Sequence, residues 1–392
     1  MDKNRMKSFL GINLNILLLG LTSFLTDTSS EMIMPILPFF ISAVGGTGVA
    51  VGLIGGLGET VSSILKVLSG YWSDKSGRRK IFVSSGYLAS SISKIFLAFS
   101  TAWQHVLILK PLERVGKGLR TAPRDAIIAD YAGAEVRGKA FGLHRALDTS
   151  GAILGSALAL TLFWFMKLEF RAIILLGSII AFSALIPLYA VKEKRAKAKK
   201  TTLKISLTGL PSSLRLFIVI ASLFALGNFT YMFFILRAGQ FFAENERIAF
   251  AVPMLLYIWF NVIYAFFSIP SGMLSDKIGR RSVLFLGYLL FGLTSLLFAL
   301  PLSLFSLVIL FALYGLIYAM IEGNQRAFVS DLAPEELRGT SLGTFHTAIG
   351  LAALPSGIIA GTLWQYIDPT ATFFYGSALG FLAAILLLLK SL

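Results

Sequence analysis

The sequence predicts an all-α integral membrane protein with twelve transmembrane helices, arranged as two six-helix bundles. Three observations predict it: a very apolar composition, apolar runs long enough to cross a bilayer, and an internal repeat. Of the 392 residues, 56% are hydrophobic and only 14% are charged. A composition this apolar lies outside the range of soluble domains, so we expect most of the chain to be embedded in lipid.

The apolar runs give the positions of the helices. A bilayer core about 30 Å thick needs roughly 20 mostly apolar helical residues for each crossing, so we take windows of that size that end at charges, Gly or Pro. The fourth window is rich in charge and is assigned partly from its position between better ones. The predicted spans are residues 12–41, 49–71, 81–102, 107–128, 141–166, 171–191, 213–236, 250–273, 283–300, 304–327, 342–366 and 373–389.

The basic residues indicate the orientation in the membrane. A net charge of +15 could indicate nucleic-acid binding, but Lys and Arg lie in short loops between apolar spans, the pattern that membrane insertion selects. We therefore expect a multi-pass protein of the inner (plasma) membrane, with both termini in the cytoplasm and no nucleic-acid partner. The first apolar stretch is too long for a signal peptide, so we expect it to be retained. The predicted cytoplasmic loops include the basic segments 75–80 and 192–204, whereas the opposite loops hold Lys167, Arg171, Arg237 and Arg247.

Two segments recur at nearly one offset. GYWSDKSGRR at residues 70–79 returns as GMLSDKIGRR at 272–281, 202 residues later, and DYAGAEVRG at 130–138 returns as DLAPEELRG at 331–339, 201 residues later. Two matches at nearly the same spacing indicate two related halves in parallel orientation. We predict an amino-terminal bundle at 1–191, a basic cytoplasmic linker at 192–208 and a carboxy-terminal bundle at 209–392.

The repeated loop resembles a motif of the Major Facilitator Superfamily, Gly-x-Leu-x-Asp-x-x-Gly-Arg-Arg/Lys. The second copy keeps Leu274, whereas the first has Trp72 at that position. The resemblance implies the fold of that superfamily and a secondary active transporter, in which two bundles rock around a site near the bilayer midplane. It does not identify a substrate.

The resemblance also implies gating residues. Asp74 and Arg78 would lock one conformation, and Asp130 at the end of the fourth span is the expected partner of Arg78. Glu322 and Arg326, one helical turn apart near the predicted cytoplasmic end of the tenth span, could gate or simply pair. The alternative is that these charges only set the topology. The expected gating set is Gly70, Asp74, Gly77, Arg78, Asp130, Gly272, Asp276, Gly279, Arg280, Glu322 and Arg326.

The fourth span carries a charged face. Ionisable groups in the bilayer core cost at least ~2.5 kcal/mol each, so they normally face a cavity or a partner. Arg114, Lys117 and Gly118 resemble the superfamily pattern Arg-x-x-Gln-Gly, with Lys in place of Gln, which implies that Arg114 takes part in proton transfer. For Arg120 and Arg124 the alternative is that they anchor the helix end at the interface. At 100° per residue, one face holds Lys110, Glu113, Arg114, Lys117, Arg120 and Arg124.

The first span places Asp27 and Glu31 four residues apart and therefore on one face. Two acids on one face suit a proton or cation site, and together with Arg114 they form the predicted coupling site. The alternative is that both are permanently paired with the cations of the fourth span. Pro35 and Pro38 should break the helix beyond them.

The fifth span offers a local ion pair between Arg145 and Asp148. The superfamily's antiporter pattern has Gly-Pro in this helix, but Gly155 is followed by Ser156, which counts against an exporter. Amide and aromatic side chains in spans seven and eight suit an organic solute. The predicted substrate cavity consists of Glu113, Lys117, Arg145, Asp148, Asn228, Tyr231, Tyr257 and Asn261.

We predict proton-coupled export of a small organic solute, as in drug or metabolite antiporters, by a monomer without a cofactor or metal. One alternative is a carrier of an organic or phosphorylated anion, bound by Arg114, Lys117, Arg120 or Arg145. Others are a carrier of a metal or metal complex, using Asp27, Glu31 and His144, and a non-transporting membrane sensor. The chain has no Cys, and it lacks the sequence motifs of hydrolases and nucleotide-binding enzymes, so we do not expect an enzyme.

Overall fold

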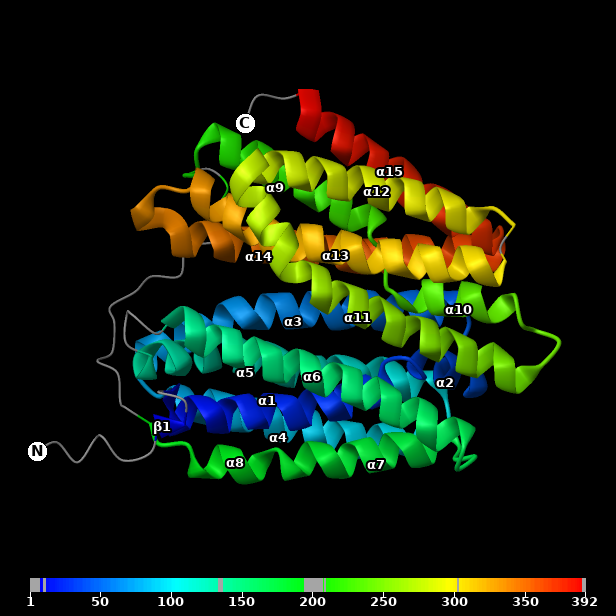
Figure 1. Cartoon of the computed structure of the whole chain (residues 1–392), viewed down its shortest axis with the longest axis horizontal. Coiled ribbons are helices and arrows are strands. Elements are labelled where there is room, and N and C mark those ends of the chain that lie inside the picture. The colour runs from blue at the N-terminus through cyan, green and yellow to red at the C-terminus, as the bar shows by residue number, and fades with distance from the viewer. Residues whose placement is uncertain are drawn as a thin grey trace, which may run out of the picture. The chain divides into compact units, whose positions relative to one another are not determined.

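The computed structural model describes residues 8–9, 12–132, 137–193, 207, 209–301 and 303–389, and nearly all of them are helical. The chain forms two compact units (Figure 1). The first unit contains Met1–Met34, Ile64–Ser100 and Ile108–Thr202, and the second contains Pro35–Ser63, Thr101–Leu107 and Leu203–Leu392. The boundary predicted at residues 192–208 stays a prediction, because most of that segment lies outside the described residues.

The first unit is a bundle of roughly parallel helices (Figure 1). A short hairpin of β1 (Ser8–Phe9) and β2 (Ile12–Asn13) precedes α1. The helices are α1 (Leu14–Ile33), the end of α3 (Gly48–Ser76), α4 (Arg79–Ala98), α5 (Trp103–Tyr131) from Ile108 onward, α6 (Arg137–Trp164), α7 (Phe170–Ser183) and α8 (Leu185–Ala190).

Glycines set the contact between α1 and α6. A Cβ on Gly151 would collide with the carbonyl oxygen of Phe24, and one on Gly155 would collide with that of Thr28. The two backbones therefore approach closely, as small residues spaced by four allow in membrane helices. This contact fixes which side chains of α1 and α6 face each other.

The second unit contains α2 (Leu37–Ala43), the start of α3, and the helices that follow residue 211. These are α9 (Ser212–Gly227), α10 (Met232–Gln240), α11 (Glu246–Ile278), α12 (Arg280–Ala299), α13 (Leu304–Leu332), the 3-10 turn η3 (Glu335–Leu337), α14 (Arg338–Tyr366) and α15 (Pro369–Leu389). Its core is aromatic: Phe234 stacks on Tyr314 at a centroid distance of 4.3 Å, and Phe298 stacks on Phe373 at 5.4 Å.

The start of α3 packs on α14, also through glycines. A Cβ on Gly52 would collide with the carbonyl oxygen of Gly357, and the converse also holds. One end of the contact is fixed by Thr60, whose Oγ1 donates to the carbonyl oxygen of Gly350 at 2.6 Å. The predicted outer part of the second span is therefore held by the eleventh.

The predicted break in the first span is confirmed: α1 ends at Ile33 and α2 begins at Leu37, with Pro35 between them and Pro38 in the first turn of α2. A second break divides the seventh predicted span, where α9 ends at Gly227 and α10 begins at Met232.

The all-helical membrane fold is confirmed, whereas the count of twelve crossings is not fully shown. Ten helices among the described residues are long and apolar enough to span a bilayer, and they coincide with ten predicted spans. The two segments outside this set are α1 with α2, which proline interrupts, and α5, which is too rich in charge. For these two the crossing stays a prediction.

Candidate functional site

The charged face of α5 packs against α4 at a close crossing. A Cβ on Gly116 would collide with the carbonyl oxygen of Gly86 and approach the side chain of Ser90, so the two backbones nearly touch. The crossing brings Lys94 of α4 into the same buried region as Glu113 and Arg120 of α5. The face that helical periodicity predicts therefore lies largely inside the first unit, with Lys117 as its exposed member.

Glu113 is the centre of a buried ion cluster. Its Oε2 lies 2.7 Å from Lys110 Nζ and 3.9 Å from Arg114 Nε, and Ser90 Oγ donates to Oε1 at 3.4 Å. Only 3% of the Glu113 side chain is exposed. The predicted cavity residue Glu113 and the predicted coupling residue Arg114 are thus in one ion cluster. Arg114 also reaches Met34, with 3.5 Å between its Nη2 and the thioether sulfur.

Asp27 meets an acid that the sequence did not pair with it. Its carboxyl group hydrogen bonds to that of Asp148 on α6. A hydrogen bond between two carboxyl groups requires a proton on one of them, so this arrangement suits a pair that shares one proton. Arg145 Nη1 lies 3.1 Å from Asp148 Oδ2, so the predicted Arg145–Asp148 ion pair is present and adjoins this carboxyl pair.

Glu31 lies one turn beyond Asp27 and is half-buried. Ser156 of α6 donates to its backbone carbonyl at 3.3 Å. A proline at position 156, as in the superfamily's antiporter pattern, has no hydroxyl to make this bond. The departure from the pattern therefore has a structural role in the contact between α1 and α6.

Ser23, one helical turn before Asp27 on α1, joins four helices. Its Oγ lies 3.1 Å from the Tyr87 hydroxyl and 2.9 Å from His144 Nε2, and it accepts from Arg124 Nη1 at 3.0 Å. Arg120 lies over the Tyr87 ring, 4.5 Å from its centroid. Arg120 and Arg124 therefore point into the bundle, which disfavours the alternative that they anchor at the interface.

His144, together with Asp27 and Glu31, is a candidate ligand in the alternative of a metal carrier. Within the described ranges, no group of three His, Cys, Asp or Glu side chains comes together that could hold a metal ion.

Two of the predicted cavity residues in the second unit, Tyr231 and Tyr257, form an aromatic wall. The rings of Tyr231 and Tyr257 lie 5.4 Å apart. Asn261 is buried, and its Nδ2 donates at 3.2 Å to the backbone carbonyl of Tyr257 on its own helix. Asn228 hydrogen bonds to Tyr318, and its buried Oδ1 has no hydrogen-bond partner among the described residues.

The wall continues into residues that the sequence did not single out. Phe260 lies between Tyr257 and Tyr264, at centroid distances of 5.7 Å and 6.2 Å. The Tyr264 hydroxyl donates to Glu322, and Arg326 Nη2 lies 3.4 Å from the other oxygen of that carboxylate. The sequence carried a signal for these residues, because Phe260 and Tyr264 follow Tyr257 on α11 at helical spacings of three and four residues.

The gating loop of the first repeat requires a correction. The expected pair of Arg78 and Asp130 is wrong, because Arg79 makes the contacts. Its Nη2 lies 3.1 Å from Asp74 Oδ1, and its Nη1 forms an ion pair with Asp130. Arg79 is buried, whereas Arg78 is exposed and precedes α4 as its N-cap residue.

In the second repeat, Arg280 takes this bridging role. Its Nε forms an ion pair with Asp331, and its Nη2 lies 3.6 Å from Asp276 Oδ1. The next residue, Arg281, donates to the carbonyl oxygens of Leu387 and Leu388, both at 2.9 Å.

One additional residue in the first loop explains the exchange of roles. Gly77 and Gly279 both have positive φ, 66° and 90°, and are 202 residues apart. However, α4 begins at Arg79 and α12 at Arg280, which are 201 residues apart. Arg79 is therefore the counterpart of Arg280. The recurrence of Gly86-Tyr87-Leu88 as Gly287-Tyr288-Leu289, 201 residues later, carried this signal.

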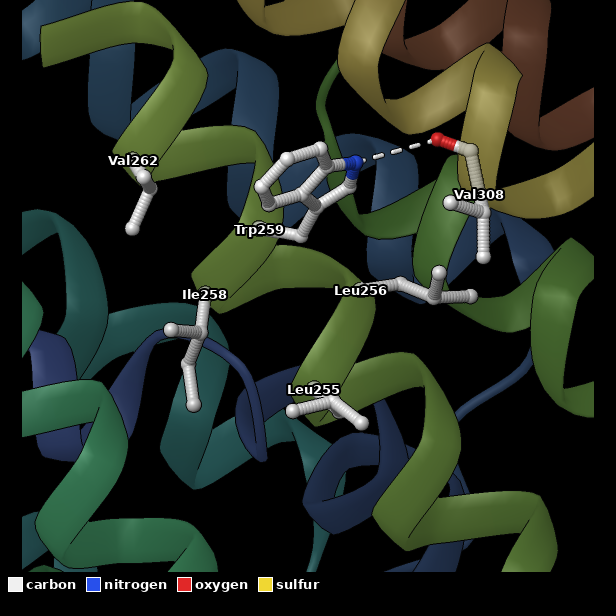
Figure 2. A pocket seen from close by; sticks show the side chains of 6 residues that line it. All are labelled: Leu255, Leu256, Ile258, Trp259, Val262 and Val308. Atoms are coloured by element: carbon white, nitrogen blue, oxygen red, sulfur yellow. Dashed lines mark hydrogen bonds between the residues drawn. The ribbon is translucent and has the colours of Figure 1, made fainter. Parts of the chain in front are cut away.

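An apolar hollow lies elsewhere, between α11 and α13 (Figure 2). It encloses about 280 Å³, and no predicted site residue lines it. Trp259 Nε1 donates to the backbone carbonyl of Val308 at 3.2 Å, so the indole polar group is satisfied. The lining is suited to hydrocarbon and offers no polar group to a solute. It consists of Leu255, Leu256, Ile258, Trp259, Val262 and Val308.

Comparisons with known proteins agree with this architecture. The family model described as Major Facilitator Superfamily matches residues 19–258 and 223–391. An uncharacterised transporter of that type from Methanocaldococcus jannaschii is 53% identical over 376 residues, which cover 95% of this chain and 94% of the relative. The multidrug resistance protein MdtH of Aeromonas salmonicida is 23% identical, over 89% of this chain and 87% of its own length.

The fold is similar to that of solved transporters. The crystal structure of the nucleoside transporter NupG superposes with a TM-score of 0.78 over 96% of this chain and 98% of that one, at 16% identity. The match of the family model to both halves and the 53% identity to a transporter of the same type cover almost the whole chain. The chain therefore belongs to the Major Facilitator Superfamily.

Proposed function

We propose that this transporter couples the movement of a proton to the export of a small organic solute. The observation that carries the proposal is the hydrogen bond between the Asp27 and Asp148 carboxyl groups inside the first unit. Buried acids in membrane helices are costly and normally mark ion or proton pathways. The similarity to a multidrug resistance protein supports an organic solute and the outward direction.

The carboxyl pair can work as a switch because its charge changes on loading. With one shared proton the pair carries one negative charge, and without it two. Lys117 and Arg120 both act electrostatically on Asp27, so loss of the proton strengthens their attraction to it. Binding or release of the proton therefore changes how strongly Asp27 attracts Lys117 and Arg120. A solute that contacts these two cations then binds with an affinity that depends on the proton.

The two bridging arginines support a gating role for the predicted cytoplasmic loops. Arg79 links the loop after α3 to the end of α5 through Asp130, and Arg280 links the equivalent elements through Asp331. Each ion pair connects two helices that alternating access requires to move as one body. We propose that these bridges, together with Gly77 and Gly279, stabilise one conformation.

We further propose that the protein is a monomer of the plasma membrane with both termini in the cytoplasm. The basic loops support this orientation, because Lys and Arg concentrate on the cytoplasmic side of membrane proteins.

The proposal is tested by reconstituting the purified protein into liposomes that contain a pH-sensitive dye. Cationic, neutral and anionic organic solutes are then added in turn. We expect at least one solute to change the internal pH, and we expect Asp27→Asn and Asp148→Asn to abolish that change while solute exchange across the membrane continues. Glu244→Gln, at an exposed position between α10 and α11, is the matched control. Wild-type proton flux in both Asp variants would refute the role of the pair.

A further inference from the structure

Three cations of the first unit, Lys94, Lys117 and Arg120, make no close ion pair among the described residues. Among the residues that the structure describes, no carboxylate lies within 4.0 Å of Lys94, Lys117 or Arg120. Their neighbours differ: Lys110 and Arg114 pair with Glu113, Arg124 with Asp125, and Arg145 with Asp148. Asp27 and Glu113 act on these cations only from beyond that distance, so an anion that reached them would supply a close counter-charge inside the bundle.

Arg120 is the most constrained of the three. It is 4% exposed, and its guanidinium lies over the Tyr87 ring at 4.5 Å. Its buried Nη1 has no hydrogen-bond partner among the described residues. The ring holds the guanidinium plane in place, because Tyr87 is itself bonded to Ser23. Arg120 thus presents a fixed, unused donor to the interior of the bundle.

Lys94 supplies a second buried charge close by. It is 1% exposed, and its ammonium donates only to hydroxyl groups, those of Ser29 at 2.9 Å and Ser30 at 2.8 Å. The charges of Arg120 and Lys94 act on each other, so the two groups share one electrostatic environment. Hydroxyls satisfy hydrogen bonds but do not neutralise the charge.

Lys117 gives this environment an accessible side. It lies on α5 one turn before Arg120, and it is exposed where Arg120 and Lys94 are buried. Lys117 and Arg120 both act on Asp27, which is also one of the acids that act on Lys94. The three cations therefore share one electrostatic environment with the acid of the carboxyl pair, and Lys117 is its exposed member.

We propose that Lys94, Lys117 and Arg120 form an anion subsite that binds the carboxylate or phosphate group of the transported solute. The inference deepens the proposed function and rests on it, since the subsite adjoins the Asp27–Asp148 pair. A guanidinium with free donors binds such oxygens with directional, charge-assisted hydrogen bonds, and a lysine ammonium adds a point charge. The same three cations repel a cationic solute and offer little to a neutral one.

The subsite is tested by ligand-dependent thermal unfolding of the purified full chain in detergent, followed by tryptophan fluorescence. The probes are benzoate and phenyl phosphate, with benzamide and benzylamine as neutral and cationic counterparts of similar shape. We expect saturable stabilisation by one or both anions and by neither counterpart. Arg120→Gln and Lys94→Gln should each weaken anion binding about tenfold or more, the effect of losing one charge-assisted hydrogen bond. Arg171→Gln, on the exposed start of α7, should bind as wild type.

Three results would overturn the subsite: no stabilisation by either anion, equal stabilisation by benzylamine, or unchanged affinity in both variants. If Arg120→Gln does not fold, Lys94→Gln and Arg120→Lys provide the same comparison, and Arg120→Lys should retain charge but lose affinity. The two proposals fail separately. If the anions bind but no solute evokes a proton flux, the subsite stands and proton coupling is rejected. If benzylamine alone evokes a proton flux, proton coupling stands and the anion subsite is rejected.

Discussion

Arg79 and Arg78 are adjacent in the gating loop. Substitution of each by Gln distinguishes the gating contact in the structure from the contact that the sequence motif implies. The motif assigns the gating contact to Arg78, whereas Arg79 bridges Asp74 and Asp130. Because Gln has no charge and a shorter reach, Arg79→Gln removes both ion pairs. Arg78→Gln changes an exposed side chain that makes neither contact.

The expected magnitude follows from burial. The Arg79 side chain is 9% exposed, but those of Asp74 and Asp130 are 33% and 36% exposed. Loss of one partner from a fully buried pair costs about 3–5 kcal/mol, and loss of an exposed pair costs at most about 1 kcal/mol. The half-exposed acids place Arg79→Gln between these limits, at about 1–3 kcal/mol. Arg78→Gln should stay within about 0.5 kcal/mol, as surface substitutions do.

Reversible unfolding of the two variants in mixed micelles, at increasing denaturant, measures the free-energy difference directly. Transport by the same two variants, reconstituted into liposomes, should change more for Arg79→Gln, since the bridge it removes stabilises one conformation more than others. An equal loss of stability in both variants, or a larger loss for Arg78→Gln, would refute the one-residue shift between the repeats.

Four further predictions follow from individual contacts. Arg280→Gln should destabilise less than Arg79→Gln, by under about 1 kcal/mol in the same unfolding assay, because Asp276 and Asp331 are 68% and 53% exposed. Gly52→Ala should destabilise the fold by about 1–3 kcal/mol through its collision with α14, whereas Gly142→Ala, with open space around the new Cβ, should not. Because the chain has no Cys, single cysteines at Glu244 and Glu335 should be labelled by an impermeant maleimide in intact cells only at position 244. Asp27→Asn should make anion binding, followed by the same thermal unfolding at several pH values, insensitive to release of the shared proton, because an amide beside Asp148 keeps the single negative charge of the protonated pair.

Contacts within one helix could be predicted from the sequence, and contacts between helices could not. The break at Pro35 and the ion pair of Arg145 with Asp148 follow from local geometry, and the structure has both. The partner of Asp27 is Asp148, 121 residues away, and no helical periodicity relates α1 to α6. The close packing of Gly151 on Phe24 determines that contact, and it depends on how two helices cross.

The loop motif failed for a different physical reason. A motif aligns residues by type, and both loops contain Gly-Arg-Arg, so Arg78 and Arg280 align. The helix after each loop begins one residue later in the first repeat than that alignment requires. Which arginine reaches the acids depends on the first residue with helical dihedral angles, and two adjacent arginines give no sequence signal for it.

The charge of the solute determines the sign of coupling at this site. A proton on the Asp27–Asp148 pair removes a negative charge that competes with an anion for Lys117 and Arg120. An anionic solute therefore binds best when the proton is present, and the two would cross the membrane together. A cationic solute would bind best to the unprotonated pair and would be exchanged for the proton, as the sequence led us to expect. The anion subsite that we propose at Lys94, Lys117 and Arg120 therefore implies joint movement, in which export of an acidic solute down its own gradient would carry a proton outward.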